Sequence, residues 1–93
     1  MKVEFADNFD KSVKKIKDKI ALKRLDVLIE KLKNAQSLTE ISNVKSLSNT
    51  SFLYRIRTGN YRLIVEYCDG EITILLIEYL KRDDNTYKKI ITN

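Results

Sequence analysis

The sequence predicts a single α+β domain over residues 1–93, in which a pair of helices packs on one face of a mostly antiparallel sheet. Apolar residues recur at helical spacing over residues 9–32. Two alternating apolar runs flank Gly59-Asn60, and a third run follows over residues 71–80. A two-residue turn of this type joins antiparallel strands, so the expected order is β-α-α-β-β-β with a short helix at the end.

Length and composition limit the classes of protein to consider. With 93 residues the chain has room for one hydrophobic core and no linker. No apolar run approaches the roughly 20 residues that span a bilayer, and the first residues lack the apolar stretch of a signal peptide. The single cysteine, Cys68, excludes an internal disulfide framework and predicts a cytoplasmic protein.

The chain contains no histidine, which restricts the chemistry available to it. Ser-His and Cys-His nucleophile pairs are excluded, as are most zinc sites, so we expect neither a metal nor another cofactor. A formal net charge of +5 and a pI near 9.4 predict an acidic partner. Charge alone does not distinguish nucleic acid from an acidic protein segment.

The N-terminal third predicts a strand followed by two helices. Residues 2–6 alternate weakly, and Asp7-Asn8 offers a helix N-cap. Asp18 is a second expected cap. The predicted apolar stripes are Phe9, Val13, Ile16 and Ile20, then Leu22, Leu25, Leu28, Ile29 and Leu32. Residues 34–50 are expected to connect the helices to the sheet, held against the core by Leu38, Ile41, Val44 and Leu47.

The hairpin over residues 53–67 determines which side chains share a face. A loop of only Gly59-Asn60 places Thr58 opposite Tyr61, Arg57 opposite Arg62 and Ile56 opposite Leu63. The expected core face then contains Tyr54, Ile56, Tyr61, Leu63, Val65 and Tyr67. The opposite face gathers Arg55, Arg57 and Arg62, whose mutual repulsion predicts either an anion such as phosphate or a solvated basic surface.

The last predicted strand, residues 71–80, begins after a second turn signal at Asp69-Gly70. If that turn is tight, Ile72, Ile74 and Leu76 continue the core face, and Leu75, Ile77 and Tyr79 lie beside the arginines. Such a mixed surface suits base stacking or peptide binding. Lys81-Arg82 ends the strand, and residues 83–85 are expected to cap a terminal helix that carries Tyr87, Ile90 and Ile91.

The run Y-R-I-R-T-G-N-Y-R-L-I-V-E-Y resembles the hairpin of RelE/ParE-superfamily toxins of bacterial type II toxin–antitoxin pairs. The preceding segment 43–47, which contains Lys45, is similar to the one that leads into that hairpin. The ending K-R-D-D-N-T-Y favours the RelE-like branch, whose members cut messenger RNA on the ribosome. The resemblance implies a RelE-like fold, an antitoxin partner and a metal-independent reaction at the ribosomal A site.

In that reaction the ribose 2′-hydroxyl attacks the adjacent phosphate. The resemblance implies that Arg57 and Arg62 clamp the phosphate, that Arg82 stabilises the leaving oxygen and that Tyr87 stacks on a base or orients the hydroxyl. The residues expected to bind RNA are Arg55, Lys81, Lys45 and Tyr79. Arginine stays protonated, so Arg57 is a poor general base. Either Tyr87 or Lys81 accepts the proton, or the enzyme depends on electrostatic stabilisation alone and is slow.

Other interpretations of the same residues stay open. A ParE-like member inhibits DNA gyrase and is no nuclease, and a third possibility is an inactive module that only binds antitoxin. Tyr87 fits a packed core position as well as an active site, and Lys81 and Arg82 fit ordinary charges at a strand end.

Overall fold

The computed structural model describes residues 1–47, 52–67 and 73–81. Its elements are β1 (Lys2–Phe5), α1 (Asp7–Lys14), α2 (Lys19–Asn34), the 3-10 helix η1 (Leu38–Glu40), β2 (Val44–Ser46), β3 (Leu53–Thr58), β4 (Tyr61–Tyr67) and β5 (Thr73–Lys81). The strands form one sheet in the order β1-β5-β4-β3-β2, in which β1 is parallel to β5 and every other pair is antiparallel. The predicted α+β class with a mostly antiparallel sheet is confirmed.

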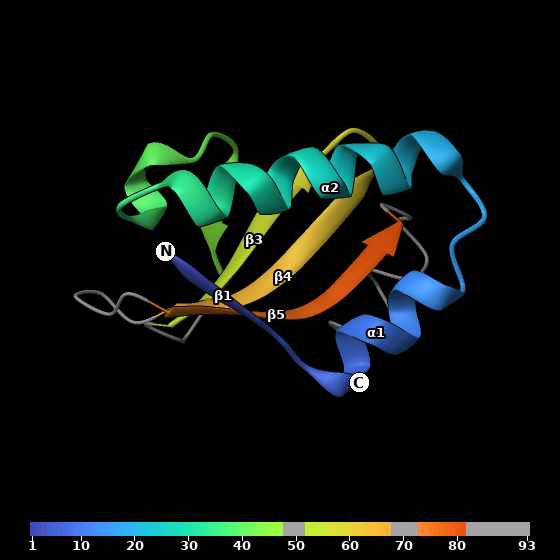
Figure 1. Cartoon of the computed structure of the whole chain (residues 1–93), viewed down its shortest axis with the longest axis horizontal. Helices are drawn as coiled ribbons and strands as arrows, with labels where there is room; N and C mark the ends of the chain where they lie inside the picture. The colour runs from blue at the N-terminus through green and yellow to red at the C-terminus, as the bar shows by residue number, and fades with distance from the viewer. Residues whose placement is uncertain (48–51, 68–72, 82–93) are drawn as a thin grey trace.

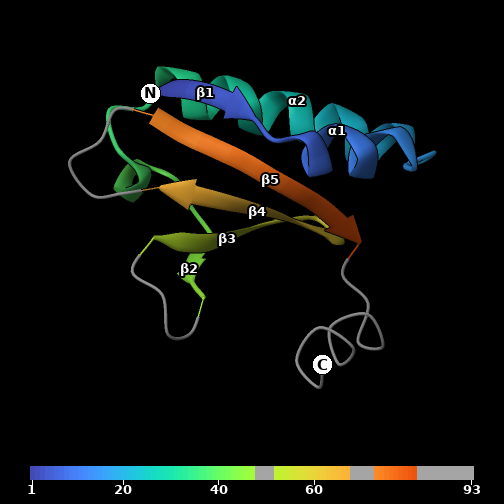
Figure 2. The same ribbon diagram turned by 90° about the horizontal axis from the view of Figure 1, so that it is seen from below.

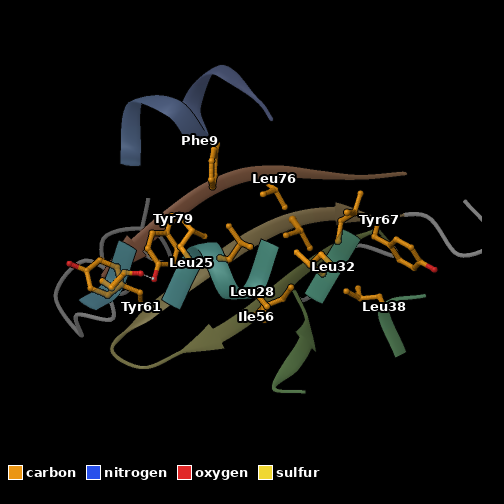
Figure 3. Packing of buried hydrophobic residues seen from close by; sticks show 14 residues of the cluster. Phe9, Leu25, Leu28, Leu32, Leu38, Ile56, Tyr61, Tyr67, Leu76 and Tyr79 are labelled. Atoms are coloured by element: carbon orange, nitrogen blue, oxygen red, sulfur yellow. Dashed lines mark hydrogen bonds between the residues drawn. The ribbon is translucent and has the colours of Figure 1, made fainter. Parts of the chain in front are cut away.

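Both helices cover the same face of the sheet. Helix α2 runs across the strands, and α1 lies beside β5 (Figures 1 and 2). The core between these layers is built from apolar side chains of α2 and of alternate strand positions, several of which are labelled in Figure 3. Neither helix of the described chain combines the length and apolar character that crossing a lipid bilayer requires.

Helix α2 follows the predicted stripe. Leu25, Leu28 and Leu32 are buried, and burial of a leucine side chain contributes about 1.5–3 kcal/mol each. The carboxylate of Asp18 accepts the backbone N–H groups of Ile20 (3.0 Å) and Ala21 (3.2 Å), so the predicted cap of this helix is confirmed.

Helix α1 begins differently from the prediction. Its N-cap is Ala6, which has no side-chain acceptor, so the cap expected at Asp7-Asn8 is wrong. Asp7 is already the first helical residue, where its negative charge lies near the positive end of the helix dipole. Phe9 is the buried residue of this helix and contacts the Phe5 ring, with the ring centroids 5.4 Å apart.

The hairpin has the predicted register. Thr58 pairs with Tyr61, and each preceding residue of β3 pairs with the next residue of β4. Of the two turn residues only Gly59 has a positive φ, of 60°. The side chain of Arg24 on α2 lies against this glycine and fills the space that a Cβ atom would need. The positive φ favours glycine here, whereas the Arg24 guanidinium is the end of a flexible side chain that can move aside.

The segment expected to be only a connection contains β2 and η1. Strand β2 has three residues, which is too short for alternation to be recognised in the sequence, and it pairs with the middle of β3. Ser37 and Glu40 form a capping box at the start of η1. The predicted contacts with the core are confirmed for Leu38, which is buried, and for Ile41 and Val44, which pack against the core, but Leu47 is not among the residues that do so.

Strand β5 departs from regular alternation at one point. Val65 pairs with Leu76 and Ile64 pairs with Glu78, so Ile77 is an extra residue in a β-bulge. Ile74 and Leu76 are buried as predicted. Beyond the bulge the two faces exchange, which moves Tyr79 into the core; its predicted place beside the arginines is therefore wrong.

Several sequence predictions lie outside the described residues. They concern Cys68, the Asp69-Gly70 turn, Ile72, Arg82 and the terminal helix with Tyr87.

Candidate functional site

The face of the sheet opposite the helices carries the predicted arginines, and we call it the arginine face. Arg57 and Arg62 are direct cross-strand partners, and Leu80 continues their row on β5. The next row consists of Lys45, Arg55, Ile64 and Glu78. The structure therefore brings together four of the predicted site residues: Lys45, Arg55, Arg57 and Arg62.

The arginine pair is held by rigid backbone. Directly opposed residues of an antiparallel pair have Cβ atoms only about 5 Å apart, so Arg57 and Arg62 place two cations side by side. The Arg57 backbone N–H donates to the Asn43 carbonyl (3.1 Å), which ties the outer edge of β3 to the segment before β2. Both arginines are half-buried, and paired guanidinium groups are the kind of donor that suits a phosphate.

Arg55 has an unmet hydrogen-bond donor. Its Nε atom is shielded from solvent and has no hydrogen-bond partner in the part of the chain that the structure describes. A buried donor without an acceptor costs about 1–3 kcal/mol. This donor is also closed to solvent, so a ligand would reach it only after the Arg55 side chain moved.

Glu78 is a member of the arginine face that the sequence reasoning missed. Regular alternation after Ile74 and Leu76 assigns Glu78 to the core, whereas the bulge at Ile77 turns it to the opposite side. It becomes the diagonal neighbour of Arg62, whose direct partner is Leu80. The signal available in the sequence was the carboxylate itself, because an unpaired charge at a core position indicates a break in the register.

Tyr79 is a core residue and is not available to stack on a base. It is 1% exposed, its hydroxyl donates to the Ala21 carbonyl (2.9 Å), and its backbone N–H donates to the Ser12 hydroxyl (3.0 Å). Its ring stacks on Tyr61 with the centroids 5.0 Å apart (Figure 3). Burial, with a smaller contribution from Tyr61, raises the pKa of the Tyr79 phenol to about 12.

Lys81 also lies away from the arginines. It is the cross-strand partner of Tyr61, so it belongs to the helix-covered side of the sheet. Its predicted contact with RNA beside the arginine pair is therefore not supported by its position. Among residues 1–47, 52–67 and 73–81, no group of three or more carboxylate or thiol side chains is arranged to hold a metal ion.

A groove of about 1290 Å³ opens between α2 and the edge of β3 that β2 leaves uncovered. Two exposed apolar side chains of α2, Ile20 and Val27, line it together with charged groups of both signs. The backbone of the hairpin turn forms its other wall. An apolar groove of this kind suits an amphipathic protein segment better than a nucleic acid.

Comparison with known proteins agrees with this geometry. Residues 3–85 match a family model described as the ParE toxin of the type II toxin–antitoxin system parDE. The chain is 39% identical over 67 residues to toxin RelE3 of Methanocaldococcus jannaschii, an alignment that covers 71% of this chain and 75% of that protein.

Solved structures show the same fold. The RelB–RelE antitoxin–toxin complex from Methanococcus jannaschii superposes with a TM-score of 0.75 at 31% identity, over 92% of this chain and 96% of that one. The RelE–RelB complex from Pyrococcus horikoshii OT3 gives a TM-score of 0.70 at 22% identity, covering 89% and 96% of the two chains. The isolated Escherichia coli RelE toxin gives a TM-score of 0.63 at 17% identity, over 98% of this chain and 95% of that one. At this identity the likeness concerns the fold alone.

Proposed function

This chain belongs to the ParE toxin family of type II toxin–antitoxin systems, within the RelE/ParE superfamily, and on that premise we propose that it is an endoribonuclease that cuts messenger RNA in the ribosomal A site. The proposed reaction is attack of a ribose 2′-hydroxyl on the adjacent phosphorus. The bond to the 5′-oxygen breaks, which leaves a 2′,3′-cyclic phosphate and a free 5′-hydroxyl. Translation stops because the message is severed, and this role places the chain in the cytoplasm.

The observation that carries the proposal is the direct pairing of Arg57 with Arg62 on an open sheet face. The transition state concentrates negative charge on the non-bridging phosphate oxygens. Two preorganised guanidinium groups stabilise that charge without a metal, and removing one such donor from an active site typically costs a factor of about 10²–10³ in rate. Arg55, with its unmet Nε donor, supports the same phosphate or its neighbour.

The 2′-hydroxyl proton needs an acceptor, and arginine remains protonated at neutral pH. Glu78 is the carboxylate diagonal to Arg62 on the arginine face, and we assign it this task in place of Lys81, which faces the other way. The family resemblance implies that Arg82 stabilises or protonates the leaving 5′-oxygen and that Tyr87 stacks on a base or orients the 2′-hydroxyl. Glu78→Gln is expected to slow cleavage while leaving RNA binding in place.

The proposed partner is an antitoxin, as in the RelB–RelE complexes that share this fold. Its acidic, amphipathic segment is expected to cover the arginine face or to dock on the helices. Ile20 and Val27 in the groove beside α2 provide the apolar anchors for such a segment. Ordering it on the toxin would neutralise the cations and silence the activity.

Controlled expression without antitoxin tests the proposal. New messenger-RNA 5′ ends are mapped over the first minutes for the native chain, for Arg62→Ala and for Lys33→Ala, which removes an exposed cation from the far end of α2. Cuts inside translated codons with the native chain and Lys33→Ala, but not with Arg62→Ala, are expected. Growth arrest with intact messages and broken DNA would favour a gyrase inhibitor, and no arrest from folded protein would favour a module that only binds antitoxin.

A further inference from the structure

A second cationic site lies on the opposite side of β5 from the arginine face. Strand β1 pairs with β5 only as far as Leu76, and no other described strand pairs with the outer edge of β5 beyond that residue. Helix α1 lies along this edge, where its Ser12 hydroxyl accepts the Tyr79 backbone N–H. Between the helix and the strand is a hollow of about 610 Å³, which we call the lysine hollow.

Four exposed lysines surround the lysine hollow: Lys11, Lys15, Lys17 and Lys81. None of them forms an ion pair with any residue that the structure describes. Asn8 adds a polar side chain to its wall, whereas the Ser12 hydroxyl is engaged with the Phe9 carbonyl and the Tyr79 N–H. Like charges gathered at one place repel one another, and an anion relieves that repulsion.

Two carboxylates also line the hollow, but neither forms an ion pair with a lysine of the described chain. The Asp18 carboxylate is engaged as the N-cap of α2, where it accepts two backbone N–H groups. Glu78, like Leu80, belongs by register to the arginine face and reaches the hollow at the edge of β5. The lysines therefore outnumber the carboxylates by four to two, and the free positive charge points into solvent.

The lining of the hollow favours phosphates over an acidic protein segment. A docked protein segment needs apolar anchors, and the exposed large apolar side chains of the described chain (Phe5, Ile20, Val27 and Phe52) all lie elsewhere. Lysine carries a point charge on a flexible side chain, which suits backbone phosphates of a nucleic acid of any sequence. The hollow thus differs from the groove beside α2, which has apolar anchors and mixed charges.

The lysine hollow is continuous with the candidate active site. Leu80 lines the hollow, and its cross-strand partner is Arg62. The arginine pair and the hollow therefore meet at Leu80, on the outer strand of this part of the sheet. This proximity makes the hollow a candidate contact for RNA next to the cleaved nucleotide.

We propose that the lysine hollow is a second phosphate-binding site, which holds RNA backbone outside the cleavage site and takes no part in the chemistry. The inference rests on the proposed function for the identity of the polyanion as RNA. The hollow supplies affinity and the arginine face supplies catalysis. Loss of the lysines therefore weakens binding without removing the cleavage chemistry.

Two triple variants with equal loss of charge test this inference. Lys11→Gln/Lys15→Gln/Lys17→Gln alters the hollow, and Lys23→Gln/Lys31→Gln/Lys33→Gln removes three exposed lysines of α2 as a control. The probe is a single-stranded RNA with 2′-O-methyl riboses, which cannot be cleaved by 2′-hydroxyl attack. Binding is measured by fluorescence anisotropy between about 50 and about 200 mM salt. Thermal melts confirm that both variants are folded.

The variant with three substitutions in the lysine hollow is expected to lose two to three phosphate contacts. Each contact contributes roughly 0.7 to the slope of log binding constant against log salt concentration, so the slope should decrease by about 2. The affinity at low salt should fall about tenfold or more. The control triple is expected to change the slope by less than half as much. Equal losses in the two triples, or no loss in the first, would overturn the proposal.

A poly-glutamate peptide serves as the competing probe. If the hollow triple loses affinity only for this peptide and not for RNA, the hollow binds acidic protein and the proposal is overturned. Because the RNA probe cannot be cleaved, the result does not depend on nuclease activity. RNA binding through the hollow by a chain that leaves messages intact in cells would contradict the proposed function and leave this inference standing.

Discussion

The two faces of the β3–β4–β5 sheet are made from alternate residues of the same strands, yet they have opposite character. On the helix-covered face, Leu63, Val65 and Ile74 have no exposed surface, and no polar or charged residue of the described chain is buried. On the arginine face, two cations oppose each other directly and a third keeps a donor unmet. One face is packed against the helices, and the other carries cations, one of which has a donor with no partner among the described residues.

This difference implies that stability and activity depend on different residues, which alternate along the same strand. Neighbouring residues of β4 point to opposite faces, so a substitution at one position affects folding and a substitution at the next affects binding. Substitutions at four sites test the separation, ordered by their expected effect on the free energy of unfolding.

The largest expected effect is at Leu63. Leu63→Ala removes a fully buried side chain and is expected to lower the free energy of unfolding by about 2–5 kcal/mol. The matched variant Ile64→Ala, on the half-buried opposite face, is expected to cost less than half as much. Urea denaturation of both variants measures the two losses, and equal losses would mean that the faces do not differ in burial.

Tyr79→Phe tests the register after the bulge. The variant keeps the ring and removes the hydroxyl that donates to the Ala21 carbonyl, which is expected to cost about 1–2 kcal/mol of stability and to leave RNA affinity unchanged. The opposite pattern, weaker RNA binding with unchanged stability, would place Tyr79 on the arginine face.

The same residue predicts a pH dependence. Burial raises the Tyr79 pKa to about 12, whereas an unfolded tyrosine titrates near 10. The folded state holds this proton more tightly, so the contribution to stability is complete below about pH 10 and is lost as the pH rises to about 12. The free energy of unfolding of the native chain should therefore fall more steeply over that interval than that of Tyr79→Phe; parallel curves would contradict the assignment.

Asp18→Ala tests how the helical layer is anchored. The Asp18 cap holds the start of α2 over the buried face, and its loss is expected to cost about 1 kcal/mol. Asp7→Ala, at the first residue of α1 and not at its cap, is expected to cost only a few tenths of a kcal/mol. Thermal melts of the two variants compare these losses of stability. A larger loss for Asp7→Ala than for Asp18→Ala would mean that Asp7 caps α1, as the sequence predicted.

The smallest effect on stability is expected at Arg57. Arg57→Gln removes the repulsion between this residue and Arg62. Its free energy of unfolding is therefore expected to be equal to that of the native chain, or higher by a few tenths of a kcal/mol. A loss comparable with that of Leu63→Ala, measured by urea denaturation, would show that this arginine is structural.

The features that local chemistry determines were predictable from the sequence. Gly59 permits the positive φ of the hairpin turn, and this turn fixes the pairing of Arg57 with Arg62. The leucine stripe and the Asp18 cap of α2 likewise follow from spacing and side-chain chemistry. The arginine pair at the centre of the candidate site therefore follows from the residues of one hairpin.

The features that depend on tertiary contacts were not predictable. The bulge at Ile77 directs Tyr79 toward the carbonyl of Ala21 and its backbone toward Ser12, and both partners are more than 50 residues away along the chain. Strand β2 exists because the uncovered edge of β3 accepts it, a reason that three residues of sequence do not reveal. Glu78 was missed for the same reason as Tyr79.

The most direct test of the separation between the faces is single-turnover cleavage of a message bound to purified ribosomes. The native chain is expected to produce a 2′,3′-cyclic phosphate end, and a 2′-deoxy substitution at the cut position should abolish the product. Arg57→Gln, folded as stably as the native chain, is expected to cleave about 10²–10³-fold more slowly. Undiminished cleavage by Arg57→Gln, or none by the folded native chain, would contradict the assignment of catalysis to the arginine face.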